Sequence, residues 1–348
     1  MKVLIAMSGG VDSSVSALLL KQQGYEVIGG TMEIYQEEKS IQDSQKIAKK
    51  LNIPFHIFKF KEIFSEKVIR NFVEEYLQGR TPNPCVVCNK EVKFEALLEQ
   101  AEKLGAQYIA TGHYAQIEQK DGRYLLKKGK SGTKDQTYFL YRLTQEQLSK
   151  ILFPIGNMEK DDVRKIAKEN DLFVADKADS QEVCFIKDND YIGFIEKTTK
   201  KKIPSGNFVD TEGNVLGIHR GVYHYTIGQR KGLGISSNKP LFVVDIDVDR
   251  NIVVLGDDID TLGNTLIAKD LNWIMFDSLD KEIKVTAKIR SASKEVGCTV
   301  KPMGDDRVEV LFDTLQRAIT PGQSVVFYDG DYVVGGGVIE SSLNKLSV

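Results

Sequence analysis

Cys85 and Cys88 stand three residues apart and are the strongest candidates for covalent chemistry in this chain. Pro82 and Pro84 stiffen the approach to them, and the residues that follow predict a helix that begins just after Cys88. A thiol near a helix N-terminus has its thiolate stabilised by the helix dipole and by free N–H groups. The sequence therefore predicts a reactive thiol at Cys88.

Cys184 is a second candidate, whereas Cys298 lies in a predicted strand and is expected to be a small core residue. Several interpretations of the first three cysteines stay open: unrelated buried thiols, a Cys-x-x-Cys redox switch, a nucleophile with a sulfur carrier, or an iron–sulfur cluster on three thiolates. Structural zinc is disfavoured, because it normally takes four ligands and only Cys184 and His113 remain to complete the set.

A second chemical motif, Ser-Gly-Gly-Val-Asp-Ser-Ser, occupies residues 8–14 between a predicted strand and a predicted helix. Its glycines allow the backbone to approach phosphate oxygens, and the N–H groups at the helix start favour an anion. It has neither the Gly-Lys-Ser/Thr of a Walker loop nor the Gly-x-Gly-x-x-Gly of a dinucleotide site. We predict a phosphate site, the alternative being a tight turn in which Asp12 merely caps the helix.

The first 200 residues alternate strand and helix, which indicates a doubly wound parallel sheet. Strands are predicted at residues 3–7, 26–32, 55–60 and 108–111, and helices at residues 13–23, 41–51, 63–77 and 90–104. Asp121-Gly122 between two alternating stretches predicts a hairpin turn. Ligands of such sheets bind beyond the carboxyl ends of the strands, where residues 8–14 and His113 would lie.

The pattern changes after about residue 204, where helical periodicity gives way to short alternating runs and frequent turn signals. We predict an α/β domain over residues 1–204, a small β-rich central domain over residues 205–268, and a C-terminal β-barrel over residues 269–348.

Composition narrows the protein class. The 348 residues include 47 Lys+Arg and 49 Asp+Glu, and Gly 29, Pro 8 and Cys 4 exclude collagen-like, disordered and disulfide-scaffold classes. No apolar run approaches the roughly 20 residues of a membrane helix, and we expect a cytoplasmic protein with no membrane partner. The balanced charge excludes a protein whose whole surface is basic, but it allows a local strip of basic residues that binds RNA. Candidates for that strip are Arg123, Lys127, Lys128, Lys130, Lys134, Arg230, Lys231 and Arg290.

Residues 8–14 resemble the PP-loop of ATP pyrophosphatases, which cleave ATP between its α and β phosphates. Together the motifs resemble those of bacterial tRNA-specific 2-thiouridylases, the MnmA family, over almost the whole chain. The matching segments are residues 6–13, 79–84, 88–90, 110–115, 134–136, 152–156, 179–186, 225–234 and 320–323.

The resemblance implies an enzyme that thiolates the 2-carbonyl of the wobble uridine in tRNAs of the Lys, Glu and Gln type. ATP with Mg²⁺ would adenylate the carbonyl oxygen in the N-terminal domain, and the C-terminal barrel would contact tRNA. A persulfide on Cys184, charged by a sulfur-relay protein or a cysteine desulfurase, would supply the sulfur. Cys88 would be the nucleophile, left in a disulfide with Cys184, and the enzyme is expected to be a monomer.

The resemblance also implies binding residues. Those that match the family's ATP contacts are Ala6, Met7, Ser8, Gly9, Gly10, Val11, Asp12, Ser13, Met32 and Gly112. Those that match contacts with the target base or the rest of the tRNA are Asn83, Pro84, Cys85, His113, Lys134, Asp135, Gln136, Arg290, Ser291 and Gln323. The alternatives are a core role for Met32, a structural role for His113 and a solvated turn at residues 134–136.

Two positions depart from the family pattern. Cys85 stands where many members have Asp, so a 4Fe–4S cluster on Cys85, Cys88 and Cys184 is an alternative to the persulfide route. Ser291 stands where an aromatic residue is common, so base stacking is not expected there. Two rival functions are an ATP-dependent amidase or ligase for small molecules and a nucleotide-gated tRNA-binding protein without enzymatic activity.

Overall fold

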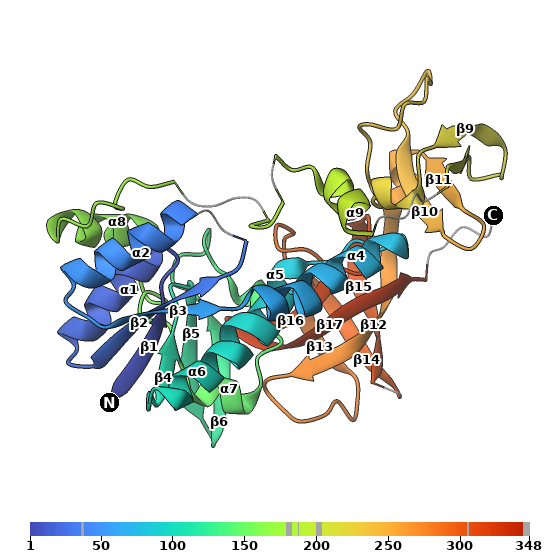
Figure 1. The fold of residues 1–348 in the computed structure, drawn as a ribbon. Helices are drawn as coiled ribbons and strands as arrows, with labels where there is room; N and C mark the ends of the chain where they lie inside the picture. The colour runs from blue at the N-terminus through green and yellow to red at the C-terminus, as the bar shows by residue number, and fades with distance from the viewer. Residues whose placement is uncertain (36–37, 179–182, 187, 200–203, 305, 344–348) are drawn as a thin grey trace.

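The computed structural model describes residues 1–35, 38–178, 183–186, 188–199, 204–304 and 306–343. Figure 1 shows an α/β part at the N-terminus, a β-barrel formed late in the chain, and a small β-rich part at the far end of the barrel. The predicted fold class is confirmed, and the three predicted sets of domain bounds stay a prediction.

The N-terminal sheet is entirely parallel, with strand order β3-β2-β1-β4-β7. Its strands are β1 (Lys2–Ala6), β2 (Glu26–Glu33), β3 (Phe55–Lys59), β4 (Tyr108–Ala110) and β7 (Ile151–Leu152). The strand order reverses direction between β1 and β4. The segments that leave the carboxyl ends of these two strands therefore border the crevice where open α/β sheets bind ligands.

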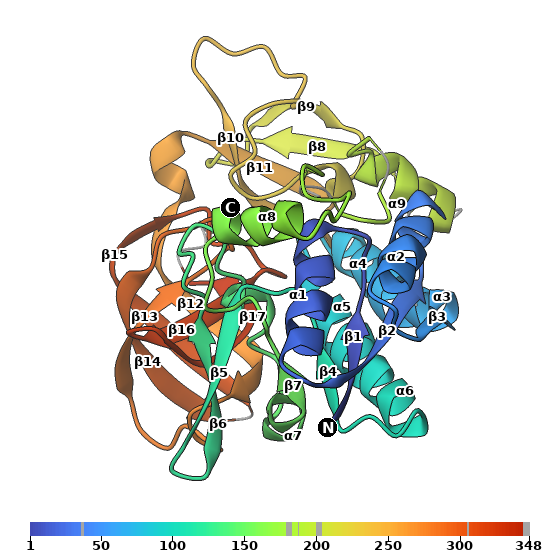
Figure 2. The same ribbon diagram turned by 90° about the vertical axis from the view of Figure 1, so that its left-hand side faces the viewer.

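Helices cover both faces of this sheet. On one face lie α1 (Val11–Gln22), α2 (Glu38–Lys50) and α8 (Lys160–Glu169), and on the other lies α6 (Leu97–Lys103). The same part of the chain also contains α3 (Lys61–Phe64), α4 (Arg70–Leu77), α5 (Pro84–Cys88) and α7 (Gln145–Ser149). Val3 and Ile5 of β1 pack in the core formed with α1, α2 and α8, and Leu4 packs in the core of the opposite face, with α4 and α6. Figure 2 shows α8 next to α1.

Two predicted helices are longer and less regular than their sequence pattern suggests. The π-helical segments η1 (Ser65–Ile69) and η2 (Asn89–Ala96) continue α3 into α4 and α5 into α6. The second helix begins at Pro84, not after Cys88 as predicted, because the Asn83 side chain accepts a hydrogen bond from the Cys85 N–H and Pro84 suits the first helical position. Cys88 thus lies inside the helix.

The hairpin of β5 (Ala115–Lys120) and β6 (Arg123–Lys128) confirms the turn predicted at Asp121-Gly122, whose φ values are 50° and 80°. Gln136 follows this hairpin, ahead of the short helix η3 (Thr137–Phe139). The hairpin joins the C-terminal sheet through a pairing of Lys127 with Tyr332. The α/β part is therefore attached to the barrel by backbone pairing.

The C-terminal barrel has the strand order β12-β15-β14-β13-β16-β17 and closes through pairing of β12 with β17. Its strands are β12 (Leu262–Trp273), β13 (Ile283–Lys288), β14 (Val296–Gly304), β15 (Arg307–Arg317), β16 (Ser324–Asp329) and β17 (Tyr332–Ser342). Cys298 is buried in the barrel core, as predicted.

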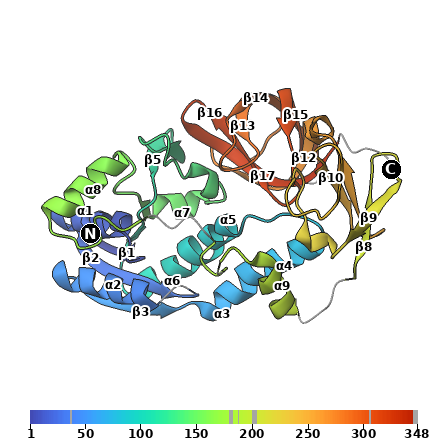
Figure 3. The same ribbon diagram turned by 90° about the horizontal axis from the view of Figure 1, so that it is seen from above.

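The small central sheet has the order β10-β11-β8-β9. Its strands are β8 (Gly206–Val209), β9 (Val215–His219), β10 (Phe242–Asp247) and β11 (Ile252–Gly256), accompanied by the short helices η4 (Val222–His224) and η5 (Asp258–Thr261). In Figure 3, α4 and α9 (Tyr191–Thr199) lie between the α/β sheet and this part. Within the described residues, no helix is long and apolar enough to cross a membrane.

Candidate functional site

The predicted phosphate motif forms a tight loop between β1 and α1. Gly9 has φ +70°, and a Cβ there would lie 2.4 Å from the carbonyl oxygen of Ser40, so both the backbone conformation and the space require glycine. Gly10 is the N-cap residue of α1, and because glycine has no side chain it offers no hydrogen bond to the N–H groups of the first turn. Because the first N–H groups of a helix have no intrahelical partner, they remain suited to an anion.

Hydroxyl groups fix the shape of this loop. The Ser8 N–H donates to Ser13 Oγ at 3.2 Å, and Ser14 Oγ donates to the Gly10 carbonyl at 2.8 Å. Ser44 Oγ donates to the Met7 carbonyl at 3.1 Å, which attaches the loop to α2. The loop is thus preorganised by its own side chains.

A second loop, at residues 111–114 after β4, lies directly against the first. Gly112 packs so tightly that a Cβ there would lie 2.7 Å from the Ser13 nitrogen. Tyr114 Oη donates to Asp12 Oδ1 at 2.8 Å, and the Tyr114 N–H donates to Gln136 Oε1 at 2.9 Å. The structure therefore brings Gly112 to the start of α1.

His113 in this second loop faces the interior. It is 9% exposed, its Nδ1 lies 2.7 Å from Thr111 Oγ1, and its ring packs against Phe94 of η2 and Phe153. Burial, followed by the nearby Lys93 charge, holds the pKa of His113 well below its ordinary value. The residue is neutral at pH 7, and its contacts fit the structural alternative better than direct contact with tRNA.

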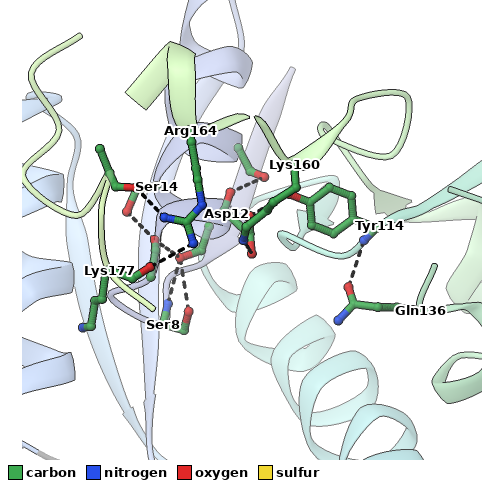
Figure 4. A network of polar contacts seen from close by, with 12 residues as sticks. Ser8, Asp12, Ser14, Tyr114, Gln136, Lys160, Arg164 and Lys177 are labelled. Carbon is green, nitrogen blue, oxygen red and sulfur yellow. Dashed lines mark hydrogen bonds and ion pairs between the residues drawn. The ribbon is translucent and has the colours of Figure 1, made fainter. Parts of the chain in front are cut away.

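Three basic residues surround the phosphate motif, and sequence reasoning missed all of them (Figure 4). Lys160 Nζ lies 2.8 Å from both carboxylate oxygens of Asp12. Lys177 Nζ donates to the Gly9 carbonyl and to Asp43 Oδ2, each at 2.9 Å. Arg164 donates to the carbonyls of Ala175 and Lys177.

One signal in the sequence could have indicated Lys160. It occupies the first turn of α8, where the helix dipole disfavours a cation. A lysine at that position suggests a partner outside the helix. Its partner, Asp12, is 148 positions away in the sequence, so no local pattern identifies it.

Cys88 and the phosphate motif are associated with different cores of the α/β part: Cys88 packs in the core that contains Leu4 of β1, whereas Val11 at the start of α1 packs in the core that contains Val3 and Ile5. Cys85 is exposed, whereas Cys88 is 7% exposed in the core that also holds Phe94. Burial raises the pKa of Cys88 to about 12. The predicted dipole-stabilised thiolate at Cys88 is therefore wrong for this conformation, because the helix begins at Pro84, four residues before Cys88, and the thiol is enclosed.

Cys184 is exposed, and its neighbour Phe185 fixes its position. The Phe185 ring packs against Phe64 and Phe72 at centroid distances of 5.5 and 5.4 Å, in the same core as Cys88. The rest of the predicted motif, residues 179–182, lies outside the described residues.

The three thiols lie close enough for their charges to interact. Although Cys85 and Cys184 reach the surface, desolvation by the surrounding protein raises the pKa of all three thiols, and the neighbouring thiols raise the pKa values of Cys88 and Cys184 further. The positive charge of Lys93 lowers the pKa values of all three thiols, but its effect is smaller than that of desolvation. In the part of the chain that the structure describes, no three His, Cys, Asp or Glu side chains are placed to hold a metal ion. The cysteines are thus near neighbours without forming a ligand set for a cluster.

The β-rich parts position the segment that carries Cys85. Gln323 Nε2 donates to the Thr81 carbonyl at 2.8 Å, and the Thr81 N–H donates to the Pro321 carbonyl at 2.9 Å. Thr81 Oγ1 also donates to Thr226 Oγ1 at 3.0 Å. Gln323 therefore contacts the backbone just before Asn83 and Pro84, which makes it a positioning residue for the predicted base-binding segment.

Two other residues predicted to contact tRNA, Asp135 and Arg290, form hydrogen bonds within the protein. Asp135 accepts hydrogen bonds from Gly129 and Thr137. Arg290 donates to the carbonyls of Ile227 and Ala318, so it joins the barrel to the central part, and Ser291 beside it is exposed. Lys134 is partly buried.

The predicted basic strip is partly neutralised. Arg123 pairs with Asp277, Lys127 with Glu118, and Lys128 with Glu295, at distances from 2.7 to 2.9 Å.

Three further residues predicted to contact ATP lie in or beside the parallel sheet. Met32 near the end of β2 is partly buried against the core of the sheet. Ala6 ends β1, and Val11 begins α1 and is buried.

Replacing Gly112 by alanine should disturb the phosphate motif. The new Cβ would meet the backbone of Ser13 and Asp12 at 2.7 to 2.8 Å, and backbone cannot move aside cheaply. We expect a loss of about 1–3 kcal/mol in the free energy of unfolding and weaker ATP binding. Gly132→Ala, with open space around its Cβ, is the matched control. Urea unfolding and ATP titration provide the readouts, and equal behaviour of the two variants would refute the close packing.

The thiols should differ in their reaction with iodoacetamide at pH 7.5. Cys85 and Cys184 are exposed, whereas Cys88 is enclosed and protonated, so the first two should be alkylated well before Cys88. Labelling of Cys88 should accelerate as the pH rises toward its pKa. Peptide mass spectrometry after timed quenching measures the order, with urea-unfolded protein as the control. Labelling of Cys88 first would contradict the structure.

Comparisons with known proteins agree with this architecture. Three family models match in order: "tRNA methyl transferase HUP domain" over residues 1–188, "tRNA methyl transferase PRC-barrel domain" over residues 192–257, and "Aminomethyltransferase beta-barrel domain" over residues 263–339.

Curated relatives match from end to end. The tRNA-specific 2-thiouridylase MnmA of Clostridioides difficile (strain 630) is 54% identical over 356 residues, covering 98% of this chain and 99% of that protein. The enzyme of the same name from Acetivibrio thermocellus is 55% identical, covering 97% and 99%. These matches confirm the resemblance found in the sequence motifs, and the chain belongs to the family of tRNA-specific 2-thiouridylases, MnmA.

Proposed function

We propose that this protein is an ATP-dependent sulfurtransferase that converts the wobble uridine of tRNA to 2-thiouridine. The observation that carries the proposal is the loop at residues 111–114. Gly112 and Tyr114 contact the phosphate motif, and His113 between them packs on the helix that carries Cys85 and Cys88. One loop thus joins an adenylation site to a set of thiols.

The phosphate motif would bind the triphosphate of ATP. Ser8, Gly9 and Gly10 supply the cradle, and α1 supplies its N-terminal N–H groups. Asp12 in the first turn is a hard oxygen ligand that suits Mg²⁺, which screens phosphate charge when bound. The uridine 2-oxygen would attack the α-phosphorus, and pyrophosphate would leave with the electron pair of the broken P–O bond.

Sulfur would then move through Cys184 and Cys88. The terminal sulfur of a Cys184 persulfide attacks C2 of the activated uridine, and AMP leaves with the oxygen. Cys88, which must first lose its proton, next attacks the inner sulfur of Cys184 as a thiolate. The S–S bond of the persulfide breaks, its outer sulfur stays on C2, and a Cys88–Cys184 disulfide remains for a thiol reductant to open.

The iron–sulfur alternative is not favoured by the positions of Cys85, Cys88 and Cys184. These residues do not form a group able to hold a metal ion among the described residues. The exposure of Cys184 suits the persulfide route, because a donor protein must reach the thiol that it charges.

The partners follow from this chemistry. The substrate would be tRNA of the Lys, Glu and Gln type, and the sulfur donor a relay protein or cysteine desulfurase. One chain holds the phosphate motif, all three cysteines and the barrel, so a monomer suffices. An enzyme acting on tRNA would work in the cytoplasm.

Reconstitution tests this proposal. Purified protein, unmodified tRNA, ATP, Mg²⁺ and a persulfide donor should yield 2-thiouridine with one AMP and one pyrophosphate released per sulfur inserted. A small-molecule ligase would consume ATP without tRNA. A tRNA-binding protein without enzymatic activity would release no pyrophosphate, so either result would refute the proposal.

A further inference from the structure

Asp12 and Lys160 form a largely enclosed ion pair at the phosphate motif. Lys160 Nζ lies 2.8 Å from each carboxylate oxygen of Asp12, and the two side chains are 11% and 29% exposed. Tyr114 Oη donates to the same carboxylate, and the lysine ammonium lies 5.8 Å from the Tyr114 ring centre. Figure 4 shows the three side chains together at the start of α1.

This arrangement places a carboxylate where a triphosphate would be received. Asp12 occupies the first turn of α1, the same helix end that offers N–H groups to an anion. A carboxylate and a phosphate at one helix end repel each other unless cations separate them. One cation, Lys160, is already in contact with the carboxylate, and the carboxylate itself is suited to a divalent ion.

Lys177 makes a useful contrast. Its ammonium is bonded to the Gly9 carbonyl and to Asp43, which is 9% exposed, so it holds the backbone of the loop in shape. Arg164 in turn holds the segment around Lys177 through the carbonyls of Ala175 and Lys177. Lys160 instead contacts a side chain that has another partner available, and a lysine ammonium on its flexible stem can change partners.

We propose that Lys160 is a ligand of the ATP triphosphate: its ammonium moves from Asp12 to the β- and γ-phosphate oxygens, which leaves the Asp12 carboxylate available to Mg²⁺ whenever the ion is present. This rests on the proposed use of ATP at the loop. When the bond from the α-phosphorus to its bridging oxygen breaks, the leaving pyrophosphate gains negative charge. The Lys160 ammonium stabilises that charge without a proton transfer.

Binding without catalysis tests this role. Titrations of α,β-methylene ATP and of AMP are carried out in EDTA, so that neither Mg²⁺ nor turnover contributes. Lys160→Met should weaken binding of the triphosphate analogue about 10- to 100-fold, as expected for loss of a charge-assisted hydrogen bond, and leave AMP within about twofold. Lys160→Arg should retain most of the affinity. Lys165→Met, an exposed lysine on the same helix, is the matched control and should change neither.

A double variant separates the proposal from a structural role. If Lys160 only neutralises Asp12, adding Asp12→Asn to Lys160→Met should restore triphosphate binding; under the proposal the affinity stays low. Equal losses for AMP and the analogue, or no loss for the analogue, would also overturn it. Thermal unfolding of each variant identifies misfolding, in which case Lys160→Gln, alone and combined with Asp12→Asn, replaces Lys160→Met in the same comparison. The same titrations distinguish a failure of the proposed function: if the protein does not use ATP, the wild type itself will not bind the triphosphate analogue.

Discussion

Cys88→Ala and Cys184→Ala should each lower tRNA thiolation by at least about 10³-fold while pyrophosphate release from ATP in the presence of tRNA continues. Removing a covalent nucleophile or carrier stops the covalent route altogether, and effects of this size are typical. In the proposed mechanism adenylation takes place at the phosphate motif, so neither thiol is needed for it. The measurement is a parallel assay of 2-thiouridine by mass spectrometry and of pyrophosphate by a coupled enzyme.

Cys298→Ala is the matched control for these variants. Cys298 is buried in the barrel core, so its replacement should change stability slightly and leave thiolation intact. The sulfur-transfer route would be contradicted if both variants thiolated tRNA at the wild-type rate. It would also be contradicted if Cys298→Ala lost activity to the same extent.

Asp12→Ala should block the first chemical step. The substitution removes the carboxylate that accepts hydrogen bonds from Tyr114 and Lys160 and that we assign to Mg²⁺. We expect pyrophosphate release to fall about 10²- to 10³-fold, the scale seen when electrostatic stabilisation of a transition state is lost. Excess persulfide donor should not rescue the variant, because sulfur transfer follows adenylation in the proposed mechanism.

An exposed acidic residue nearby provides the comparison. Asp161 lies in the first turn of α8, one position after Lys160, and faces solvent. Asp161→Ala should keep pyrophosphate release within about twofold of the wild-type rate. If Asp12→Ala released pyrophosphate as fast as Asp161→Ala, the assignment of adenylation to this loop would be wrong.

Local patterns predicted much of the fold. Apolar runs located β1 and β4, and Asp121-Gly122 located the β5–β6 hairpin, because strand burial and turn chemistry depend on adjacent residues. The start of α5 was missed, although the cap at Asn83 followed by Pro84 was visible in the sequence. The π-helical segments have no comparable local signal.

Local sequence patterns could not predict features that depend on contacts between residues far apart in the chain. Closure of the barrel requires β12 to pair with β17, and Lys160 meets Asp12 across 148 positions. Cys88 is enclosed in a core whose other members, such as Phe94 and Phe185, lie beyond its helical turn in the sequence, and this burial reverses the expectation drawn from helix position alone. Gln323 was predicted to bind tRNA, yet its visible contacts hold Thr81 and Pro82.

The central claim is that this protein inserts sulfur into tRNA through Cys88 and Cys184 at the expense of ATP. The most direct measurement is mass spectrometry of tRNA nucleosides from a strain that lacks the gene, complemented with the wild type or with Cys88→Ala. We predict that 2-thiouridine at the wobble position disappears on deletion, returns with the wild-type gene and stays absent with the variant. Unchanged 2-thiouridine in the deletion strain, or full restoration by Cys88→Ala, would contradict the claim.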